Sequence, residues 1–342
     1  MSKLILLSFD YELFLGNRSG NVQDCLVKPT DQLLCLLGEN KFKAVFFIDT
    51  IYLSRMMDNA AAFPAVANDL LVIKNQLTSV IKQGHYIFPH LHPHWLDAEY
   101  LPDINEWSLN NTRYYQFSSL SSEQQTSLFD ASVAIIRSIT DSVVPGYAID
   151  CYRAGGWSIQ PFDCFEPHFS RHQIKHEWSV IPGKYHFSDA HSFDFRNAPV
   201  TSRVYQFNKD VCVEEKDGQF TEWTISSLDF TPFEKWIDFK INGMIKRFKK
   251  RNLAVGATVA SKITAEGDIY GNKDKVRVIA SFELLNGYRV RKYLANIRKL
   301  SYYHFISHPK LLSEFDIKMM KKLFRSLKKI KSVETDFRKA QI

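Results

Sequence analysis

The chain has 342 residues, 45% of them hydrophobic, so it is long enough to bury a large core. Its net charge is +7, and no uncharged apolar stretch reaches the length of a membrane span, which excludes an integral membrane protein of the helical class. The apolar run at residues 4–9 is too short for a signal peptide, so we expect a cytoplasmic protein. The five cysteines are odd in number and form no C-x-x-C motif, which indicates reduced thiols.

The first predicted element is a strand at residues 4–9, a continuous apolar run that ends in Asp10 and Glu12. In α/β sheets and barrels, the carboxyl ends of the strands carry the ligand site. Strand alternation places both carboxylates on one side, so one could bind a metal while the other takes a proton from a metal-bound water. A strand-end turn with two solvated acids is the alternative.

Helices and strands then alternate along the chain. Pro29 opens a predicted helix, residues 44–48 form the next strand, and residues 65–83 form a long helix that Gly84 ends. A capping box at Ser121 begins a further helix. This alternation predicts an α/β fold with a parallel sheet closed as a barrel.

Residues 84–94 carry the predicted third strand and four histidines: His85, His90, His92 and His94. Histidines four apart lie on one face of a helical turn, which makes His90 and His94 the first candidates to bind a divalent metal. In an extended strand His90, His92 and His94 would share a face, so the spacing alone does not decide which two bind. Pro93 argues against the interior of a helix. A histidine-rich loop without a metal is the alternative.

We expect a single domain, residues 1–342. Within it, three segments depart from the alternation of strands and helices. Residues 95–117 indicate a loop insertion whose aromatic side chains either close over a saccharide or anchor the insertion to the barrel. Residues 203–284 alternate like strands around a hairpin turn at 211–218, which predicts β-rich insertions. Residues 315–332 predict a basic amphipathic helix.

Two later segments repeat the pattern of an apolar run that ends in a reactive residue. Arg153 follows the apolar residues 147–149, and His308 follows the run at 302–306. Trp157 and Gly155, close to that arginine, are the predicted wall of a substrate site together with Trp95. The order along the chain is therefore an acid pair, a histidine group, an arginine and a histidine.

In this order the segments resemble the motifs of the NodB-homology polysaccharide deacetylases, carbohydrate esterase family four, with particular similarity to the WbmS-like branch. Residues 8–12 (SFDYE) are similar to the first motif, residues 84–94 to the second, residues 153–157 (RAGGW) to the third and residues 305–309 (FISHP) to the fifth. Residues 44–48 also resemble the family's second strand. The sequence departs from the family at Tyr11, where many members have a second aspartate, and at Leu91, where they have a small hydroxyl residue.

The resemblance implies a distorted, incomplete barrel of about seven strands that holds one divalent metal ion, zinc or else cobalt, nickel or manganese. Tyr11 leaves open whether Asp10 or Glu12 contacts the metal, and Glu177 is a candidate to tune the final histidine. By position, the resemblance implies these roles: Asp10 as general base, Arg153 as the residue that holds it, Glu12, His90 and His94 as metal ligands, and His308 as general acid.

We therefore expect hydrolysis of an N-acyl group, above all N-acetyl, on a sugar or polysaccharide precursor in surface polysaccharide biosynthesis. Two histidines and one carboxylate leave open metal positions for a water molecule and the substrate carbonyl. The alternative is a catalytically inactive protein of this fold that binds a saccharide or a protein partner, since Tyr11 has displaced the usual second acid.

Basic residues are concentrated at 246–251 and on the helix predicted at 315–332. Such faces are either solvated or attracted to anionic lipid or pyrophosphate. The second interpretation would suit a lipid-linked or nucleotide-linked substrate and a peripheral contact at the inner face of the membrane. No nucleic-acid recognition motif accompanies the charge, so we expect no nucleic-acid partner.

Overall fold

The computed structural model describes residues 3–111, 113–249, 263–271 and 273–340. Its centre is a curved sheet in the order β10-β11-β7-β6-β3-β2-β1-β15, with β16 also paired to β1. From β11 to β15 neighbouring strands are parallel, whereas β10 is antiparallel to β11. The strands are β1 (Lys3–Tyr11), β2 (Val45–Asp49), β3 (Tyr86–Leu91), β6 (Cys151–Ala154), β7 (His176–Glu177), β10 (Val204–Phe207), β11 (Phe220–Trp223), β15 (Tyr302–Ser307) and β16 (Val333–Glu334).

The two ends of this sheet approach each other through the segment that follows β11. Ser226 N donates to His304 O at 3.1 Å, and Ile225 N donates to Val180 O at 2.8 Å. The segment therefore lies between β15 and the chain beyond β7, so it links the two sides of the curved sheet. The predicted α/β fold with a distorted, incomplete barrel is confirmed.

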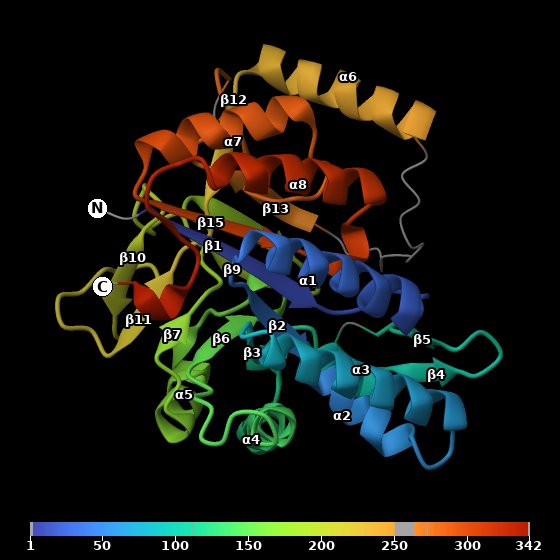
Figure 1. The fold of residues 1–342 in the computed structure, drawn as a ribbon. Helices are drawn as coiled ribbons and strands as arrows, with labels where there is room; N and C mark the ends of the chain where they lie inside the picture. The colour runs from blue at the N-terminus through green and yellow to red at the C-terminus, as the bar shows by residue number, and fades with distance from the viewer. Residues whose placement is uncertain (1–2, 112, 250–262, 272, 341–342) are drawn as a thin grey trace.

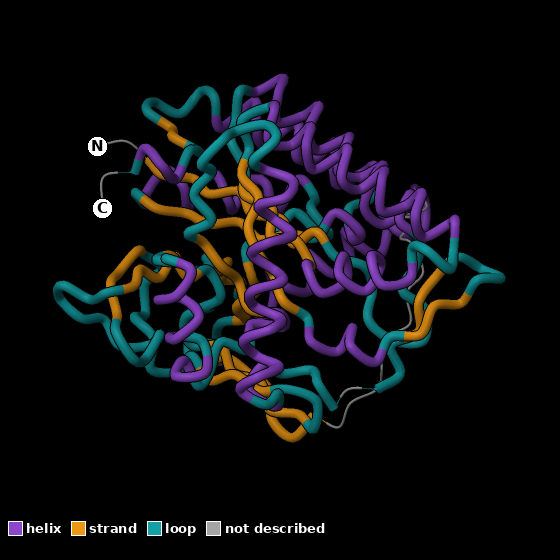
Figure 2. Tube along the Cα trace, turned by 90° about the horizontal axis from the view of Figure 1, so that it is seen from below, coloured by secondary structure: helices purple, strands orange, loops and turns teal. Residues whose placement is uncertain are grey.

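Helices surround the strands on the outside of the barrel (Figures 1 and 2). The predicted capping box is confirmed, because Ser121 accepts from Gln124 N while the Gln124 side chain accepts from Ser121 N. Gly84, with φ of 75°, turns the chain from α3 into β3. The helices are α1 (Lys28–Asn40), α2 (Thr50–Asn59), α3 (Pro64–Lys82), α4 (Ser122–Thr140), α5 (Glu166–His172), α6 (Pro232–Lys249), α7 (Gly287–Lys299) and α8 (Glu314–Leu327).

Three small sheets lie outside the barrel. The hairpin predicted around 211–218 is confirmed as the turn between β10 and β11. Residues 203–284 also contain α6, while residues 250–262 and 272 lie outside the described residues, as do Lys250 and Arg251 of the basic cluster. The small sheets are β4 (Glu99–Leu101) with β5 (Glu106–Ser108), β12 (Ser227–Phe230) with β14 (Val276–Ile279), and β9 (Ser192–Asp194) with β8 (Lys184–Ser188) and β13 (Ile263–Asp268).

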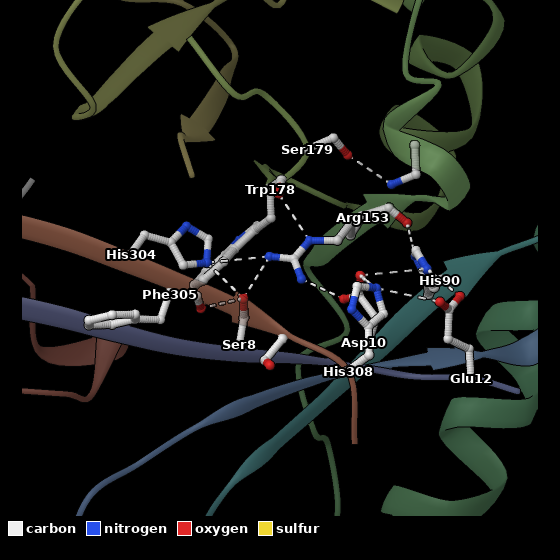
Figure 3. Close-up of polar contacts among 12 residues, drawn as sticks. Ser8, Asp10, Glu12, His90, Arg153, Trp178, Ser179, His304, Phe305 and His308 are labelled. Atoms are coloured by element: carbon white, nitrogen blue, oxygen red, sulfur yellow. Dashed lines mark hydrogen bonds and ion pairs between the residues drawn. The ribbon is translucent and has the colours of Figure 1, made fainter. Parts of the chain in front are cut away.

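Alternation along β1 separates two environments, as expected for a strand covered on both faces. Ile5 and Phe9 pack in the layer between the barrel and the helices, whereas Ser8 and Asp10 point into the barrel (Figure 3). An apolar cluster lies deeper in the barrel than this polar pair, so Asp10 faces one mouth of the barrel. Its members include Leu6, Phe47, Trp178, Trp223 and Phe337.

In the described part of the chain, no helix combines the length and the apolarity that crossing a membrane would require.

Candidate metal centre

The centre is assembled at the carboxyl ends of neighbouring parallel strands. Asp10 is the second-last residue of β1, and Glu12 directly follows this strand. His90 is the second-last residue of β3. The register of β2 against β3 pairs Asp49 with His90, which brings the end of β3 level with the end of β1. The acid pair and the histidines, far apart in sequence, therefore meet at one mouth of the barrel.

Three buried side chains could hold a metal ion: Glu12, His90 and His92, whose ligand atoms all lie within 4.8 Å of one another. His90 Nε2 lies 3.4 Å from Glu12 Oε2 and 3.1 Å from His92 Nε2. His92 Nε2 lies 2.6 Å from Glu12 Oε2. The three residues are between 2% and 6% exposed, so the cluster is shielded from bulk solvent.

The orientation of His90 suits a metal ligand. Its Nδ1 lies 2.9 Å from the carbonyl oxygen of Arg153. Because a carbonyl only accepts, this contact places the proton on Nδ1 and leaves the lone pair of Nε2 facing Glu12. A backbone partner that sets the tautomer in this way is typical of metal-binding histidines.

His92, and not the predicted His94, lies beside Glu12 and His90. His92 continues the extended backbone of β3, with φ of −115° and ψ of 89°, so it shares a face with His90. Pro93 then begins a short 3-10 turn that directs His94 away from Glu12, against the ring of Tyr115 at 5.1 Å. Among the described residues neither ring nitrogen of His94 has a hydrogen-bond partner, and burial with His92 nearby lowers its pKa.

Asp10 is held by Arg153, as expected. Arg153 Nη1 donates to Asp10 Oδ1 at 2.5 Å, Nη2 donates to Ser8 Oγ at 2.8 Å, and Nε donates to Trp178 O at 3.0 Å (Figure 3). Burial by itself raises the pKa of Asp10, but Arg153 and two histidines outweigh it and lower the pKa. Asp10 is therefore an aimed and ionised carboxylate.

His308 lies on the other side of the same space. Its Nε2 is 3.6 Å from Asp10 Oδ2 and 3.5 Å from Glu12 Oε1. Its Nδ1 donates to Glu283 Oε1 at 2.7 Å, and the same oxygen accepts from His308 N at 3.0 Å. Burial lowers the pKa of His308, but Glu283, with smaller contributions from Glu12 and Asp10, raises it, and the net shift is upward.

The carboxylate that contacts His308 is Glu283, and not Glu177 as suggested from the sequence. Glu177 instead accepts from Ser179 N at 2.7 Å and from Ser179 Oγ at 2.5 Å, and its register partner is Tyr152, which packs against α4 outside the barrel. Glu283 lies in the loop between β14 and α7, in a stretch with no motif. The sequence offered no local signal for it, because the contact with His308 spans 25 positions.

Lys310 is a second residue that sequence reasoning missed. Its Nζ donates to Glu12 Oε1 at 2.9 Å and to Leu13 O at 2.6 Å, and the side chain is 7% exposed. Burial raises the pKa of Glu12, but Lys310 and His92 reverse this and hold the pKa well below its usual value. One oxygen of Glu12 is thus occupied by Lys310 and the other faces the histidines. The only sequence signal was the position of Lys310, two residues after His308.

Tyr11 does not replace a site acid. It faces the helices, where its hydroxyl donates to Gln76 Oε1 at 2.8 Å. The acid pair of the site is Asp10 and Glu12, which share the inner face of β1 and its continuation. The departure that prompted the inactive alternative therefore lies outside the centre.

A cavity of about 350 Å³ opens over the centre. It is lined by Asp10, Glu12, His90, His92 and His308, and on the far side by Tyr115, Trp157, His186, His191 and Phe193. Trp157, predicted as a site wall, is part of the lining. Gly155 instead supports the wall from behind, because a Cβ there would meet Leu91 O at 2.3 Å and His92 Nδ1 at 2.8 Å.

Trp95 does not line the cavity, so its prediction as part of the substrate wall is wrong. It is 0% exposed, packs against Tyr52 and Trp107, and donates from Nε1 to Asp49 Oδ2 at 2.5 Å. Burial raises the pKa of Asp49 to about 6. Most aromatic side chains of residues 95–117 therefore anchor the insertion, and Tyr115 is the one that lines the cavity.

The donor set fits a divalent metal of the zinc type. Metal–nitrogen bonds of about 2.05 Å at tetrahedral angles separate ligand atoms by about 3.3 Å, close to two of the three spacings here. Two imidazoles and one carboxylate match the protein ligands of open, catalytic zinc sites. Among the described residues, Glu12 Oε2 has no hydrogen-bond partner of good geometry, which leaves its lone pairs for an ion.

Neither a protein-family model nor a curated protein sequence matches this chain. Three solved structures align over 98% of the chain. A protein from Mycobacterium smegmatis proposed to be a polysaccharide deacetylase gives a TM-score of 0.47 at 11% identity, with 87% of that chain covered. A 4-alpha-glucanotransferase from Thermococcus litoralis gives a TM-score of 0.47 at 11% identity, with 39% of that chain covered. A family 4 carbohydrate esterase from Streptomyces lividans, in complex with acetate, gives a TM-score of 0.40 at 10% identity, with 92% of that chain covered.

Proposed function

We propose that this protein is a metal-dependent carbohydrate N-deacetylase of the NodB-homology family and of its WbmS-like branch. The observation that carries the proposal is one cavity that contains a three-ligand cluster, an arginine-held carboxylate and a glutamate-held histidine. Its substrate would be an N-acyl sugar, above all N-acetyl, in a lipid-linked or nucleotide-linked precursor of a surface polysaccharide.

Glu12, His90 and His92 would hold the ion. When bound, zinc, or else cobalt, nickel or manganese, would polarise the amide carbonyl and lower the pKa of a bound water molecule. Lys310 occupies Glu12 Oε1, so it orients Oε2 toward the histidines. Arg153 O fixes the tautomer of His90. The protein thus presents a preorganised set of three ligands with open positions beside them.

Asp10 would act as general base. Its Oδ2 faces the space between His90 and His308, at 4.0 Å and 3.6 Å from their Nε2 atoms. Because Arg153 binds the other oxygen, Asp10 presents one free oxygen to accept the proton of the attacking water. The lowered pKa ensures that this oxygen is unprotonated at neutral pH.

His308 would act as general acid toward the departing amine. Glu283 accepts the proton on Nδ1, so protonated His308 keeps a second proton on Nε2, which points into the cavity. That proton is transferred to the sugar nitrogen as the carbon–nitrogen bond breaks. Asp10 and His308 then return to their starting states through exchange of one proton with solvent.

The cavity wall would bind the sugar. Trp157 and Tyr115 offer ring faces of the kind that stack on pyranose rings, and their polar atoms can bond hydroxyls. At about 350 Å³ the cavity accommodates one or two sugar units rather than a long segment of polymer. This size favours a terminal or activated sugar as the substrate.

The test combines metal analysis with product release. The purified chain should bind one equivalent of zinc and should release acetate from N-acetylhexosamine oligosaccharides or nucleotide-linked N-acetylhexosamines. His90→Ala should lose both properties. His172→Ala, a partly exposed histidine paired with Asp130, is the matched control and should retain both. A chain that binds no metal under these conditions would show that the proposal is wrong.

A further inference from the structure

Helix α6 exposes a row of large apolar side chains. Phe233 is 67% exposed, Trp236 54%, Phe239 70% and Met244 55%. The other large apolar residues exposed in the described part of the chain are aliphatic and are distributed over other elements. An exposed group of aromatic residues on one helix is uncommon on a protein surface and marks an interaction site.

The side of α6 that faces the protein combines buried ion pairs with half-buried isoleucines, Ile237, Ile241 and Ile245. Asp238 is 1% exposed and accepts from Arg289 Nε at 2.9 Å, Arg289 Nη2 at 2.8 Å and Asn286 Nδ2 at 2.8 Å. Glu234 accepts from Lys292 Nζ at 2.7 Å. An amphipathic helix normally packs its apolar side inward. Here ion pairs attach the helix to α7, and much of its apolar surface faces outward.

Positive charge surrounds this apolar face. Lys240, Lys246 and Arg247 are exposed on α6, and Lys240 Nζ lies 5.5 Å from the centre of the Trp236 ring. Helix α7 lies next to α6 in Figure 1 and α8 lies next to α7, and both helices carry further exposed basic residues. These residues are Arg291, Arg298 and Lys299 on α7, and Lys318, Lys322 and Arg325 on α8.

The structure separates the contributions of α6 and α8. Met320, Leu323, Phe324 and Leu327, the apolar side of α8, are 0% exposed in the core. This helix can therefore attract an anionic surface, but none of its large apolar residues is as exposed as those of α6. Of the two basic helices, α6 combines exposed charge with exposed aromatic side chains.

We propose that α6 docks on a membrane surface that contains anionic lipid. Helices that lie in the lipid interface combine Trp and Phe on the apolar side with Lys and Arg around it. A second copy of this chain would bring the same positive charges face to face, which opposes self-association through α6. Nucleic acid would match the charge but would leave the aromatic face unburied. This inference does not depend on the proposed deacetylase activity.

Flotation of the full chain with lipid vesicles tests the proposal. The chain should float with vesicles of phosphatidylcholine and phosphatidylglycerol and should bind pure phosphatidylcholine vesicles at least tenfold more weakly. Raising the salt from about 0.15 M to about 1 M should release most of the protein, because screening shortens the reach of the charges. Equal binding to both vesicle types would contradict the role of the basic residues.

Exposed positions allow substitutions that leave the core intact. The combined change Phe233→Ser, Trp236→Ser and Phe239→Ser should reduce vesicle binding at least tenfold, and so should Lys240→Glu with Arg247→Glu. The matched control for the apolar variant is Leu71→Ser with Val200→Ser, at positions elsewhere that are 58% and 62% exposed. The matched control for the charge variant is Lys82→Glu with Lys216→Glu. These controls should bind as the unmodified chain does.

Trp236 offers a direct probe of insertion. It is exposed, whereas Trp95, Trp107, Trp178 and Trp223 are buried and Trp157 is half-buried. Vesicles with brominated acyl chains should therefore quench part of the tryptophan fluorescence of the unmodified chain, and Trp236→Phe should remove that quenching while binding is retained. Quenching that persists in Trp236→Phe, or a dimer that the α6 variants dissociate in sedimentation, would overturn the proposal.

Discussion

Arg153 Nη1 lies 2.5 Å from Asp10 Oδ1, although their strands, β6 and β1, are separated in the sheet by β3 and β2. The guanidinium therefore spans the interior of the barrel, where it also lies 4.2 Å from the centre of the Phe47 ring. Below it the barrel is apolar, and above it the interior carries the ligands and proton-transfer groups. The pair of Arg153 and Asp10 therefore marks how deep in the barrel the centre lies and keeps the proposed base, Asp10, ionised.

Asp10→Asn should abolish most of the proposed activity without removing the metal. The amide keeps the shape of the carboxylate but cannot accept a proton, so the rate of acetate release should fall by about 10²- to 10⁴-fold. Zinc content should stay near one equivalent, because Asp10 is not among the three ligands. Acetate release and elemental analysis check the two parts, and full activity in this variant would exclude Asp10 as the base.

His92→Ala and His94→Ala should differ in their effect on metal binding. Loss of His92 removes a ligand and should weaken zinc affinity more than about 100-fold, beyond the effect of losing a residue that only supports a ligand. His94→Ala should keep zinc affinity within a few-fold of the unmodified chain. Competition with a zinc chelator measures both values, and the reverse result would restore His94 as the ligand.

Lys310→Met should weaken zinc binding by about 10- to 100-fold, as for other residues that orient a metal ligand. Methionine keeps the apolar stem of the lysine but loses the contact between Nζ and Glu12 Oε1, so Glu12 is no longer fixed. Lys321→Met, on the surface of α8, is the control and should bind zinc normally. The chelator competition again provides the measurement.

Glu283→Gln should move the alkaline limb of the pH–rate profile to lower pH. Burial depresses the pKa of His308 and Glu283 is the largest factor that raises it, so removal of the carboxylate lowers this pKa. Because the protonated form donates to the amine, activity is then lost at a lower pH. Glu177→Gln should leave the limb in place. An unchanged limb in Glu283→Gln would mean that another group delivers the proton.

Asp238→Asn should destabilise the protein at neutral pH by about 3–5 kcal/mol, the usual cost of breaking a buried ion pair. Burial raises the pKa of Asp238, but Arg289, Asn286 and Lys235 together lower it below the unfolded value. The stabilisation is therefore present above about pH 4 and decreases as the pH falls through the lowered pKa. Urea unfolding of both chains at neutral and acidic pH checks this, and a difference in stability that does not shrink at low pH would contradict it.

Much of the fold was predictable because its signals are local. Continuous apolar runs predicted β1 and β2, Ser121 predicted the start of α4, and the turn at 211–218 predicted a hairpin. Each signal depends on backbone periodicity or on one capping hydrogen bond, which residues a few positions apart determine. The contact between Arg153 and Asp10 was expected from the resemblance of residues 8–12 and 153–157 to family motifs, not from a local signal.

The sequence by itself determined that strands and helices alternate and that acids, histidines and an arginine follow the strands. Only the tertiary structure decided which histidine faces Glu12, because the turn at Pro93 sets the direction of His92 and His94. It also decided that Glu283 and Lys310 serve the centre and that α6 turns aromatic residues outward. These outcomes depend on contacts between distant segments, which no local pattern of residues encodes.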